Sequence, residues 1–300
     1  MEIRIILNRG AADAMPFRAD GIPSDTGTTM TQTEALMQQI TSRENPLVKE
    51  YIRLGASARH RAGQGLFVLE GARLAADALD SGARLRAAFF ETGVLERHAA
   101  LVRRIQAQKI PVYGLTAPVA AKMAATQTPQ GIFCIAEILD KALSLDKISI
   151  YGAYLAVEAV QDPGNIGAML RSAEALGVDG VLLSPGCADI WSPKVVRASM
   201  GAVFRLKVYE LQDFCGTLRA LRAQGMKTLA ATADAGADDL TREPLSGGIV
   251  ACVGNEGAGL SAGCLSVCDK RVTIRMKGRA ESLNAAAAAA ILMWEIEKQR

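Results

Sequence analysis

The stretch 162-DPGNIGAMLRSAEALG-177 decides how the second half of the chain is interpreted. It follows the apolar run at 155–160 and contains a Pro-Gly turn, then Asn165, then an apolar-rich run that carries Arg171 and is typical of a helix. A buried strand followed directly by a helix is a place where α/β sheets bind ligands. Asn165 alone could be an ordinary helix N-cap, but with a lone Arg it indicates a binding site.

The same order of elements recurs through the rest of this half. Short apolar runs predict buried strands, and several of the segments between them have the spacing of helices. We therefore expect an α/β fold with a mostly parallel sheet that helices cover on both faces. The predicted strands lie at 155–160, 180–184, 204–210, 227–233, 249–255 and 271–276, and the predicted helices at 166–177, 192–201, 213–225 and 281–299.

The first half also alternates strands with helices, which predicts a small α/β domain. Residues 1–30 show no sustained period, and we interpret them as a disordered tail or as the result of an early start assignment. We expect domains at 31–140 and 153–300, joined by a linker at 141–152. The predicted helices lie at 34–40, 47–55, 72–82, 95–108 and 118–125, and the predicted strands at 65–71, 86–90, 110–115 and 131–138.

The composition argues against several classes of protein. No run of about 18 apolar residues is present and the N-terminus lacks the pattern of a secretory signal, which favours a soluble cytoplasmic protein without a membrane partner. The six cysteines form no CxxC pair and the histidines are His60 and His98, so we expect no metal site and reduced thiols in the core. Cys264 and Cys268 could share one helical face, but the spacing favours simple core residues.

Two further polar loops follow predicted strands: 254-GNEGAGLS-261 and 275-RMKGRAESLN-284. Because the carboxyl ends of parallel strands share one edge of a sheet, we expect all three loops to meet. Glu256 stands among glycines and is therefore sterically exposed, while helix capping would explain Ser282 or Asn284 but not both. The chain has no dinucleotide fingerprint, phosphate loop or Ser-His-Asp set near these loops, which argues against an oxidoreductase.

The formal net charge of +3 is mild, but the positive side chains are unevenly placed. Between residues 43 and 61 they outnumber the acidic Glu44 and Glu50, which predicts either a solvated helical face or a nucleic-acid contact. Lys194 and Arg197, beyond another predicted strand, leave the same two alternatives open. The positive side chains of this basic patch are Arg43, Lys49, Arg53, Arg59, His60 and Arg61.

The three loops together resemble the three motifs of the SpoU/TrmH-type RNA 2′-O-ribose methyltransferases of the SPOUT class. DPGNIGAMLRSA, GNEGAGLS and RMKGRAESLNAAAAAAI stand in the order of that family, and the resemblance covers about residues 150–300. The first half resembles, more loosely, the ribosomal-protein-like RNA-binding domain that precedes the catalytic domain in many members. ITSRENPLVKEYIRL and FVLEGARLAADAL carry that second resemblance.

The resemblance implies a deep trefoil knot, an exception to the rule that chains avoid knots. It implies S-adenosylmethionine bound in a bent form, RNA as the substrate, and a homodimer in which both subunits build the cleft. It assigns catalytic roles to Asn165, Arg171, Glu256, Ser282 and Asn284, and cofactor binding to Thr232, Gly254, Ile274, Met276 and Leu283. It favours RNA contact for Arg43, Lys49, Arg53, Arg59, Arg61, Lys194 and Arg197.

The expected function is methylation of a ribose 2′-oxygen, with 23S ribosomal RNA favoured over transfer RNA by the type of the first domain. Because a guanidinium keeps its proton, we expect Arg171 to clamp a phosphate and to stabilise the forming alkoxide rather than to act as a base. Glu256 and Asn165 would orient Arg171 and the ribose. The alternatives are a transfer RNA methyltransferase and a non-catalytic RNA-binding or ribosome-assembly protein on the same scaffold.

Overall fold

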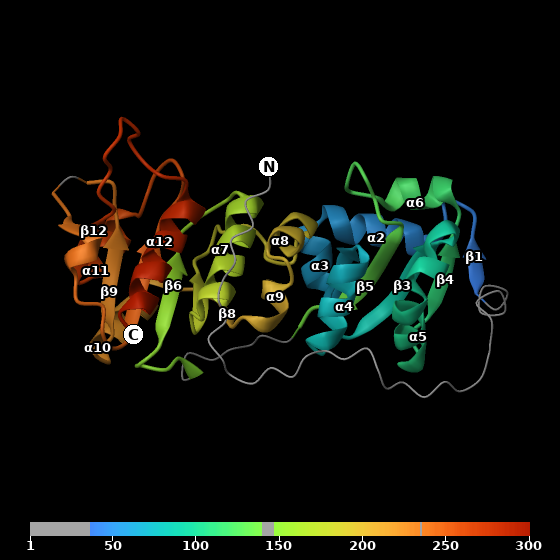
Figure 1. The fold of residues 1–300 in the computed structure, drawn as a ribbon, viewed down its shortest axis with the longest axis horizontal. Helices are drawn as coiled ribbons and strands as arrows, with labels where there is room; N and C mark the ends of the chain where they lie inside the picture. The colour runs from blue at the N-terminus through green and yellow to red at the C-terminus, as the bar shows by residue number, and fades with distance from the viewer. Residues whose placement is uncertain (1–36, 140–146, 235) are drawn as a thin grey trace. The chain divides into compact units, whose positions relative to one another are not determined.

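The computed structural model describes residues 37–139, 147–234 and 236–300 (Figure 1). The predicted tail at 1–30 lies outside the described residues, as do the first six positions of the predicted linker. Residues 37–300 cluster as one compact unit that contains two β-sheets. The domain boundaries at 140 and 153 therefore stay a prediction, although one sheet precedes this segment and the other follows it.

The first sheet has five strands among the described residues, in the order β1-β4-β3-β5-β2. β1, β4 and β3 run parallel, whereas β5 pairs antiparallel with both β3 and β2. The strands are β1 (Gln38–Ile40), β2 (Leu66–Glu70), β3 (Leu85–Glu91), β4 (Val112–Leu115) and β5 (Ile132–Glu137). Its helices are α2 (Pro46–Ala56), α3 (Ala58–Gln64), α4 (Ala72–Asp80), α5 (Ala99–Ala107) and α6 (Ala117–Met123), with short 3-10 turns at Thr92–Val94 and Glu96–His98.

The helix predicted at 34–40 is wrong over its described part. Gln38–Ile40 is a strand whose residues pair with β4, and Ile40 is buried in the core of this sheet. A helical pattern over seven residues is a weak signal, and parallel pairing with an existing strand overrides it. The other helices and strands predicted in this half lie where the structure has them, within a few residues.

The second sheet has the order β10-β12-β9-β11-β6-β7-β8 within the described residues, and every adjacent pair is parallel. The predicted α/β class with a mostly parallel sheet is confirmed. Because β6, β9, β11 and β12 run in one direction, the loops that follow them leave the same edge. The strands are β6 (Ala153–Val157), β7 (Gly180–Leu183), β8 (Val208–Glu210), β9 (Lys227–Ala231), β10 (Asp238–Asp239), β11 (Ile249–Val253) and β12 (Lys270–Thr273).

Helices pack on this sheet in two pairs. α7 and α12 contact each other, and α12 also contacts β6 and β11 (Figure 1). α10 and α11 contact each other and β9, and the large apolar cluster that includes Phe214, Leu218 and Val267 fills the space between them and the sheet. The helices are α7 (Pro163–Leu176), α8 (Pro193–Ala198), α9 (Ala202–Arg205), α10 (Phe214–Ala223), α11 (Ala262–Val267) and α12 (Ala285–Lys298), with a 3-10 turn at Leu240–Arg242.

Two predicted elements of this half have different bounds. The strand predicted at 204–210 begins only at Val208, because Phe204 and Arg205 belong to α9, where Phe204 packs on Phe67 and Arg205 pairs with Glu174. The final helix begins at Ala285 rather than at residue 281. No described helix is long and apolar enough to cross a membrane.

Candidate functional site

Asn165 lies in the first turn of α7 and is not its N-cap, so the capping alternative for this residue is wrong. Asp162, not Asn165, is the N-cap of α7: its carboxylate accepts from the Asn165 N–H at 2.9 Å, and Pro163 occupies the first turn. Donation from the Asn165 N–H holds the pKa of Asp162 below its ordinary value. Because Asp162 satisfies the helix end, the Asn165 side chain is free to make other contacts.

Side chains from the three predicted loops form one hydrogen-bonded chain. The amide nitrogen of Asn284 donates to the Asn165 side-chain oxygen at 3.0 Å, and the Asn165 amide nitrogen donates to the Glu256 carboxylate at 2.8 Å. The expectation that the three loops meet at one sheet edge is confirmed. We call Asn165, Glu256 and Asn284 the polar triad.

The orientation of both amides follows from their other partners. Asn284 caps α12, so its oxygen accepts from the N–H groups of Ala286 and Ala287 and its nitrogen must face Asn165. Asn165 must then turn its oxygen to Asn284 and its nitrogen to Glu256. The terminal helix therefore fixes which atom each member of the triad presents to its neighbour.

Glu256 is held as a carboxylate. Partial burial would raise its pKa, but donation from Asn165 and from nearby backbone N–H groups, including those of Gln161 and Asp162, outweighs the burial and lowers the pKa below its ordinary value. The carboxylate is mostly exposed and lies next to the start of α7. It is therefore a charged acceptor at neutral pH rather than a proton donor.

Two residues that organise the second loop were missed by sequence reasoning. The Asn255 oxygen accepts from the N–H groups of Gly257 and Ala258, and its nitrogen donates to the Ala159 carbonyl, which anchors the loop to the end of β6. Glu158 accepts from the backbone and hydroxyl of Ser261. A signal existed for Asn255, since Asn before a Gly-rich turn commonly closes such a turn with its own side chain.

Gly254 is required by a close backbone approach. A Cβ at this position would collide with the backbone of Gly259 and Leu260, which folds back across it. The Asn255 and Gly259 backbones exchange two hydrogen bonds, so the loop closes on itself directly beyond β11. This closure places the loop backbone at the end of the strand, where side chains of ordinary size would not fit.

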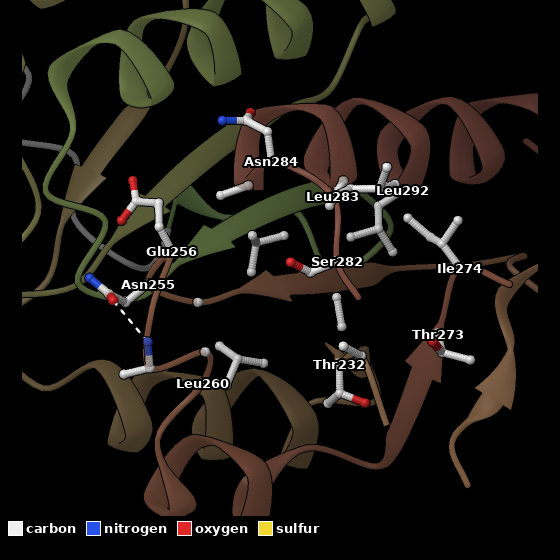
Figure 2. Close-up of a pocket in the computed structure, with 18 of the residues that line it drawn as sticks. Thr232, Asn255, Glu256, Leu260, Thr273, Ile274, Ser282, Leu283, Asn284 and Leu292 are labelled. Atoms are coloured by element: carbon white, nitrogen blue, oxygen red, sulfur yellow. Dashed lines mark hydrogen bonds between the residues drawn. The ribbon is translucent and has the colours of Figure 1, made fainter. Parts of the chain in front are cut away.

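A pocket with a volume of about 640 Å³ opens beside the polar triad (Figure 2). In Figure 2, Asn284 lies above the pocket, and Thr232 and Leu260 lie below it. Its walls combine the Gly254 loop, the end of β9, the segment that connects β12 to α12, and the start of α12. Ala285 and Ala288 of α12 leave room because each carries only a methyl group. All five residues predicted to bind the cofactor line it, namely Thr232, Gly254, Ile274, Met276 and Leu283.

Of the five residues predicted to be catalytic, the structure brings three into the polar triad. Ser282 lines the pocket with an exposed side chain, and because Asn284 makes the cap, capping does not account for Ser282. Arg171 lies on α7, six residues after Asn165, with an exposed side chain that no other described residue pairs with. The catalytic roles themselves stay predictions.

The basic patch divides into inward and outward side chains. Arg61 is 4% exposed and pairs with Asp189, while it also donates to the carbonyls of Leu54 and Gly55, so its guanidinium is occupied within the chain. The Arg43 guanidinium donates to the Pro118 carbonyl, and Lys49 pairs with Glu44. Arg53 and Arg59 are exposed and have no ion-pair partner among the described residues.

The two positive residues predicted on the turn at 192–201 lie in different surroundings. Lys194 is exposed and reaches the carboxylate of Asp162 at 3.4 Å, which places it beside the start of α7. Arg197 is half-buried and lies 3.9 Å from Glu70 of the first sheet. Lys194 therefore belongs to the surroundings of the α7 cap, whereas Arg197 faces the first half of the chain.

Comparison with known proteins agrees with this geometry. A family model described as the SpoU rRNA Methylase family matches residues 152–294, and one described as an MRM3-like substrate binding domain matches residues 45–134. The 23S rRNA (guanosine(2553)-2′-O)-methyltransferase RlmP of Bacillus subtilis (strain 168) is 31% identical over 260 residues, which cover 87% of this chain and 99% of that protein. The chain belongs to the SpoU rRNA methylase family.

Solved structures of similar methyltransferases have the same fold over most of the chain. The AdoMet-bound rRNA methyltransferase from Sinorhizobium meliloti is 30% identical, with a TM-score of 0.76 and coverage of 87% of this chain and 98% of that one. The SpoU methyltransferase AviRb from Streptomyces viridochromogenes, in complex with AdoMet, is 25% identical, with a TM-score of 0.74 and coverage of 85% and 98%. Both of these similar proteins, each matched over 98% of its own length, were solved with AdoMet bound.

The pocket of this SpoU chain suits S-adenosylmethionine in size and in chemistry. Leu260, Ile274, Leu283 and Leu292 give it apolar walls that fit a flat adenine ring. Glu256 stands at the same pocket as a carboxylate, and the cofactor carries a positive sulfonium group that a nearby negative charge stabilises. The residues present therefore fit this cofactor.

Proposed function

We propose that this chain is an S-adenosylmethionine-dependent RNA 2′-O-ribose methyltransferase that acts on 23S ribosomal RNA in the cytoplasm. The observation that carries the proposal is the polar triad at the rim of the pocket: three loops far apart in sequence are joined by two hydrogen bonds of 2.8 and 3.0 Å. Relatives named as 23S ribosomal RNA 2′-O-methyltransferases support the choice of reaction and of RNA.

Methyl transfer to a ribose needs a fixed acceptor oxygen and a place for its negative charge. The bound cofactor supplies an electrophilic methyl group; the chain has to supply position and electrostatics. The polar triad presents a carboxylate and oriented amides, which can receive ribose hydroxyls in one geometry. Ser282 adds a hydroxyl at the same pocket. The 2′-hydroxyl proton passes to a neighbouring group or to solvent as the oxygen attacks.

Arg171 clamps the target phosphate and stabilises the forming alkoxide. Its guanidinium is always charged and offers a planar fork of donors, so it binds oxyanions well and is a poor base. On one copy of the chain it lies about two helical turns beyond Asn165, outside the triad. We therefore assign the clamp to a homodimer in which Arg171 of a second copy completes the cleft.

An exposed apolar face on the terminal helix supports self-association. Ile291 and Trp294 lie one turn apart on α12, with exposed fractions of 39% and 57%. Exposed Trp side chains of this kind are enriched at protein interfaces. α12 also packs against α7, the helix that carries Arg171, so an interface over α12 lies close to that helix. The trefoil knot that the family resemblance implies stays a prediction.

The test is methyl transfer from labelled S-adenosylmethionine to ribosomal and transfer RNA isolated from cells that lack the gene. We expect label in 23S ribosomal RNA, on a ribose 2′-oxygen, and at least a 100-fold lower rate for Arg171→Ala. Label found only in transfer RNA would mean that transfer RNA, and not 23S ribosomal RNA, is the substrate. Cofactor binding without methyl transfer to any RNA, including ribosomal precursors, would favour the assembly-factor alternative.

A conservative variant tests whether Arg171 acts as a phosphate clamp or as a base. Arg171→Lys keeps the charge but loses the fork, so we expect it to remain strongly impaired at every pH. If Arg171→Lys regained most of the rate at raised pH, the residue would act as a base and the clamp would be the wrong account. Sedimentation of the wild type and of Trp294→Asp, which places a charge on the exposed face, tests the dimer.

A further inference from the structure

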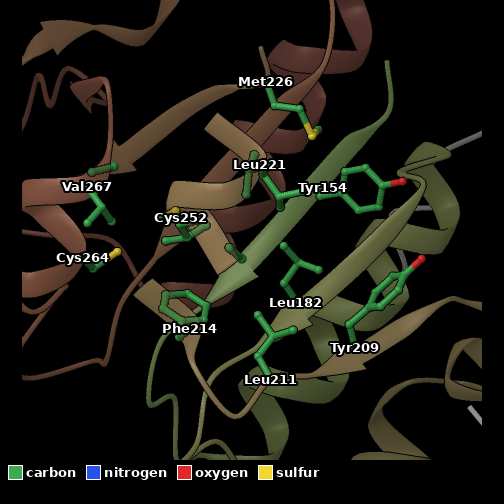
Figure 3. Close-up of a cluster of buried hydrophobic side chains, with 14 of the residues drawn as sticks. Tyr154, Leu182, Tyr209, Leu211, Phe214, Leu221, Met226, Cys252, Cys264 and Val267 are labelled. Carbon is green, nitrogen blue, oxygen red and sulfur yellow. The ribbon is translucent and has the colours of Figure 1, made fainter. Parts of the chain in front are cut away.

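Three of the six cysteines converge in the core of the second sheet. Cys252 lies in β11, Cys264 in α11, and Cys268 directly after α11. Their sulfur atoms all lie within 4.8 Å of one another, and the sulfurs of Cys252 and Cys268 are 3.8 Å apart. Figure 3 shows Cys252 and Cys264 among the apolar side chains of this core. We call these three residues the thiol cluster.

The distances within the thiol cluster suit a shared metal ion. An ion bound about 2.3 Å from each of three sulfurs holds the sulfurs about 3.8 to 4.0 Å apart. The Cys252–Cys268 pair already has this separation, so the cluster needs only small side-chain rotations to close on an ion. A core can use cysteines simply as small apolar residues, but packing does not require three sulfur atoms to lie so close together.

The donor set selects the kind of ion. Within the described residues, no histidine nitrogen or carboxylate oxygen joins the three sulfurs in this group. Soft thiolates prefer monovalent copper or zinc, and structural zinc sites almost always take four protein ligands. We infer that Cys252, Cys264 and Cys268 form a binding site for one thiophilic metal ion, with monovalent copper favoured over zinc because three sulfurs complete its coordination.

All three members of the thiol cluster are buried, and Cys268 is the one whose residue as a whole keeps some exposed surface, so an ion enters on its side and displaces thiol protons as it binds. The site also lies on two elements, β11 and α11, that contribute to the wall of the cofactor pocket. Cys252 stands two residues before Gly254, and Leu265, next to Cys264, lines the pocket. A bound ion therefore links β11 to α11 and stabilises the folded state of that wall.

The test uses the full-length, reduced and metal-free protein. It is titrated under anaerobic conditions with monovalent copper against a competing chelator and, in a second arm, with zinc, and native mass spectrometry counts the ions. Cys268→Ser is the main variant, because a half-buried position tolerates the change best. Cys215→Ser is the matched control, since Cys215 is also half-buried and packs on the same apolar core but lies outside the cluster.

We expect one copper ion per chain in the wild type and in Cys215→Ser, with a raised thermal midpoint in both. Cys268→Ser should bind more than about 100-fold more weakly, since changes one shell further out already cost about 10- to 100-fold. Equal affinity in the wild type and Cys268→Ser would overturn the site, as would a disulfide-linked product that takes up no metal. Tighter zinc binding than copper binding would overturn the choice of ion. None of these readouts depends on methyl transfer.

Discussion

The three loops at the sheet edge and the basic patch between Arg43 and Arg61 both hold polar side chains that the sequence singles out, yet only the loops bring them together. Parallel strands force their loops to one edge, so Asn165, Glu256 and Asn284 meet whatever their separation along the chain. A run of charges on helices has no such constraint. Its members face different directions, and Arg61 points into the core.

Substitution of Arg61 is expected to have the largest effect, and it tests whether this residue belongs to the core or to the surface. Arg61→Ala removes the donors to one oxygen of the Asp189 carboxylate and to two backbone carbonyls, while the Trp191 N–H still binds the other oxygen of Asp189. We therefore expect the free energy of unfolding to fall by about 3 kcal/mol. Urea denaturation measures it. Arg59→Ala, two residues earlier and exposed, is the control and should stay within about 0.5 kcal/mol. Equal denaturation midpoints for the two variants would mean that Arg61 is an exposed member of the basic patch and not a buried residue.

Asn284→Asp tests, at the sheet edge, whether Asn284 positions the substrate independently of its contribution to stability. Aspartate caps α12 as well as asparagine does, so we expect the unfolding free energy to stay within about 0.5 kcal/mol. The new carboxylate cannot donate to Asn165, which disturbs the orientation of the triad, and we expect kcat for methyl transfer to fall about 10- to 100-fold.

The matched control for this change is Asn284→Ala. It removes the cap as well as the amide, so it should add a loss of about 1 kcal/mol in stability to the loss of rate. A wild-type rate for Asn284→Asp would mean that the Asn284–Asn165 hydrogen bond does not position the substrate. The two regions would then differ in geometry but not in function.

Much of the site could be predicted because its signals are local. A strand followed by a polar loop is visible in the sequence, and the rule that such loops share one edge needs no knowledge of the remaining packing. Capping was expected to account for only one of Ser282 and Asn284, and Asn284 is that cap. The N-cap alternative for Asn165 is wrong, because Asp162, three residues earlier, caps α7.

The features that were missed depend on contacts between distant elements. Arg61 is buried only because α3 packs so that it meets Asp189, 128 residues away. The thiol cluster joins Cys252 of a strand to two residues beyond the following loop, and the spacing resembles no metal motif. The strand at Gln38–Ile40 exists only because β4 accepts it as a partner. Neither periodicity nor spacing carries such information.

A smaller effect is expected from the outward side chains of the basic patch. Arg53 and Arg59 have no ion-pair partner among the described residues, so they are free to contact phosphates. The double change to Ala should weaken RNA binding and reduce the slope of log affinity against log salt by about 1.4, if each contacts one phosphate of a single strand. Lys49→Ala is the control, since Lys49 already pairs with Glu44. An unchanged slope would mean that these arginines do not contact RNA and only form part of a solvated helical face.

The smallest effect concerns the charge of Glu256. Its folded pKa lies below the ordinary value, so its contribution to stability is present above the unfolded pKa of about 4.3 and is lost as the pH falls through the folded pKa. The carboxylate is mostly exposed, so the contribution is below about 1 kcal/mol. Urea denaturation of the wild type and Glu256→Gln should therefore show a small difference at pH 6 that shrinks toward pH 3. A stability difference that grew on acidification would mean that Glu256 is protonated in the folded chain. Glu256 would then donate a hydrogen bond to the substrate, whereas we propose that it accepts one.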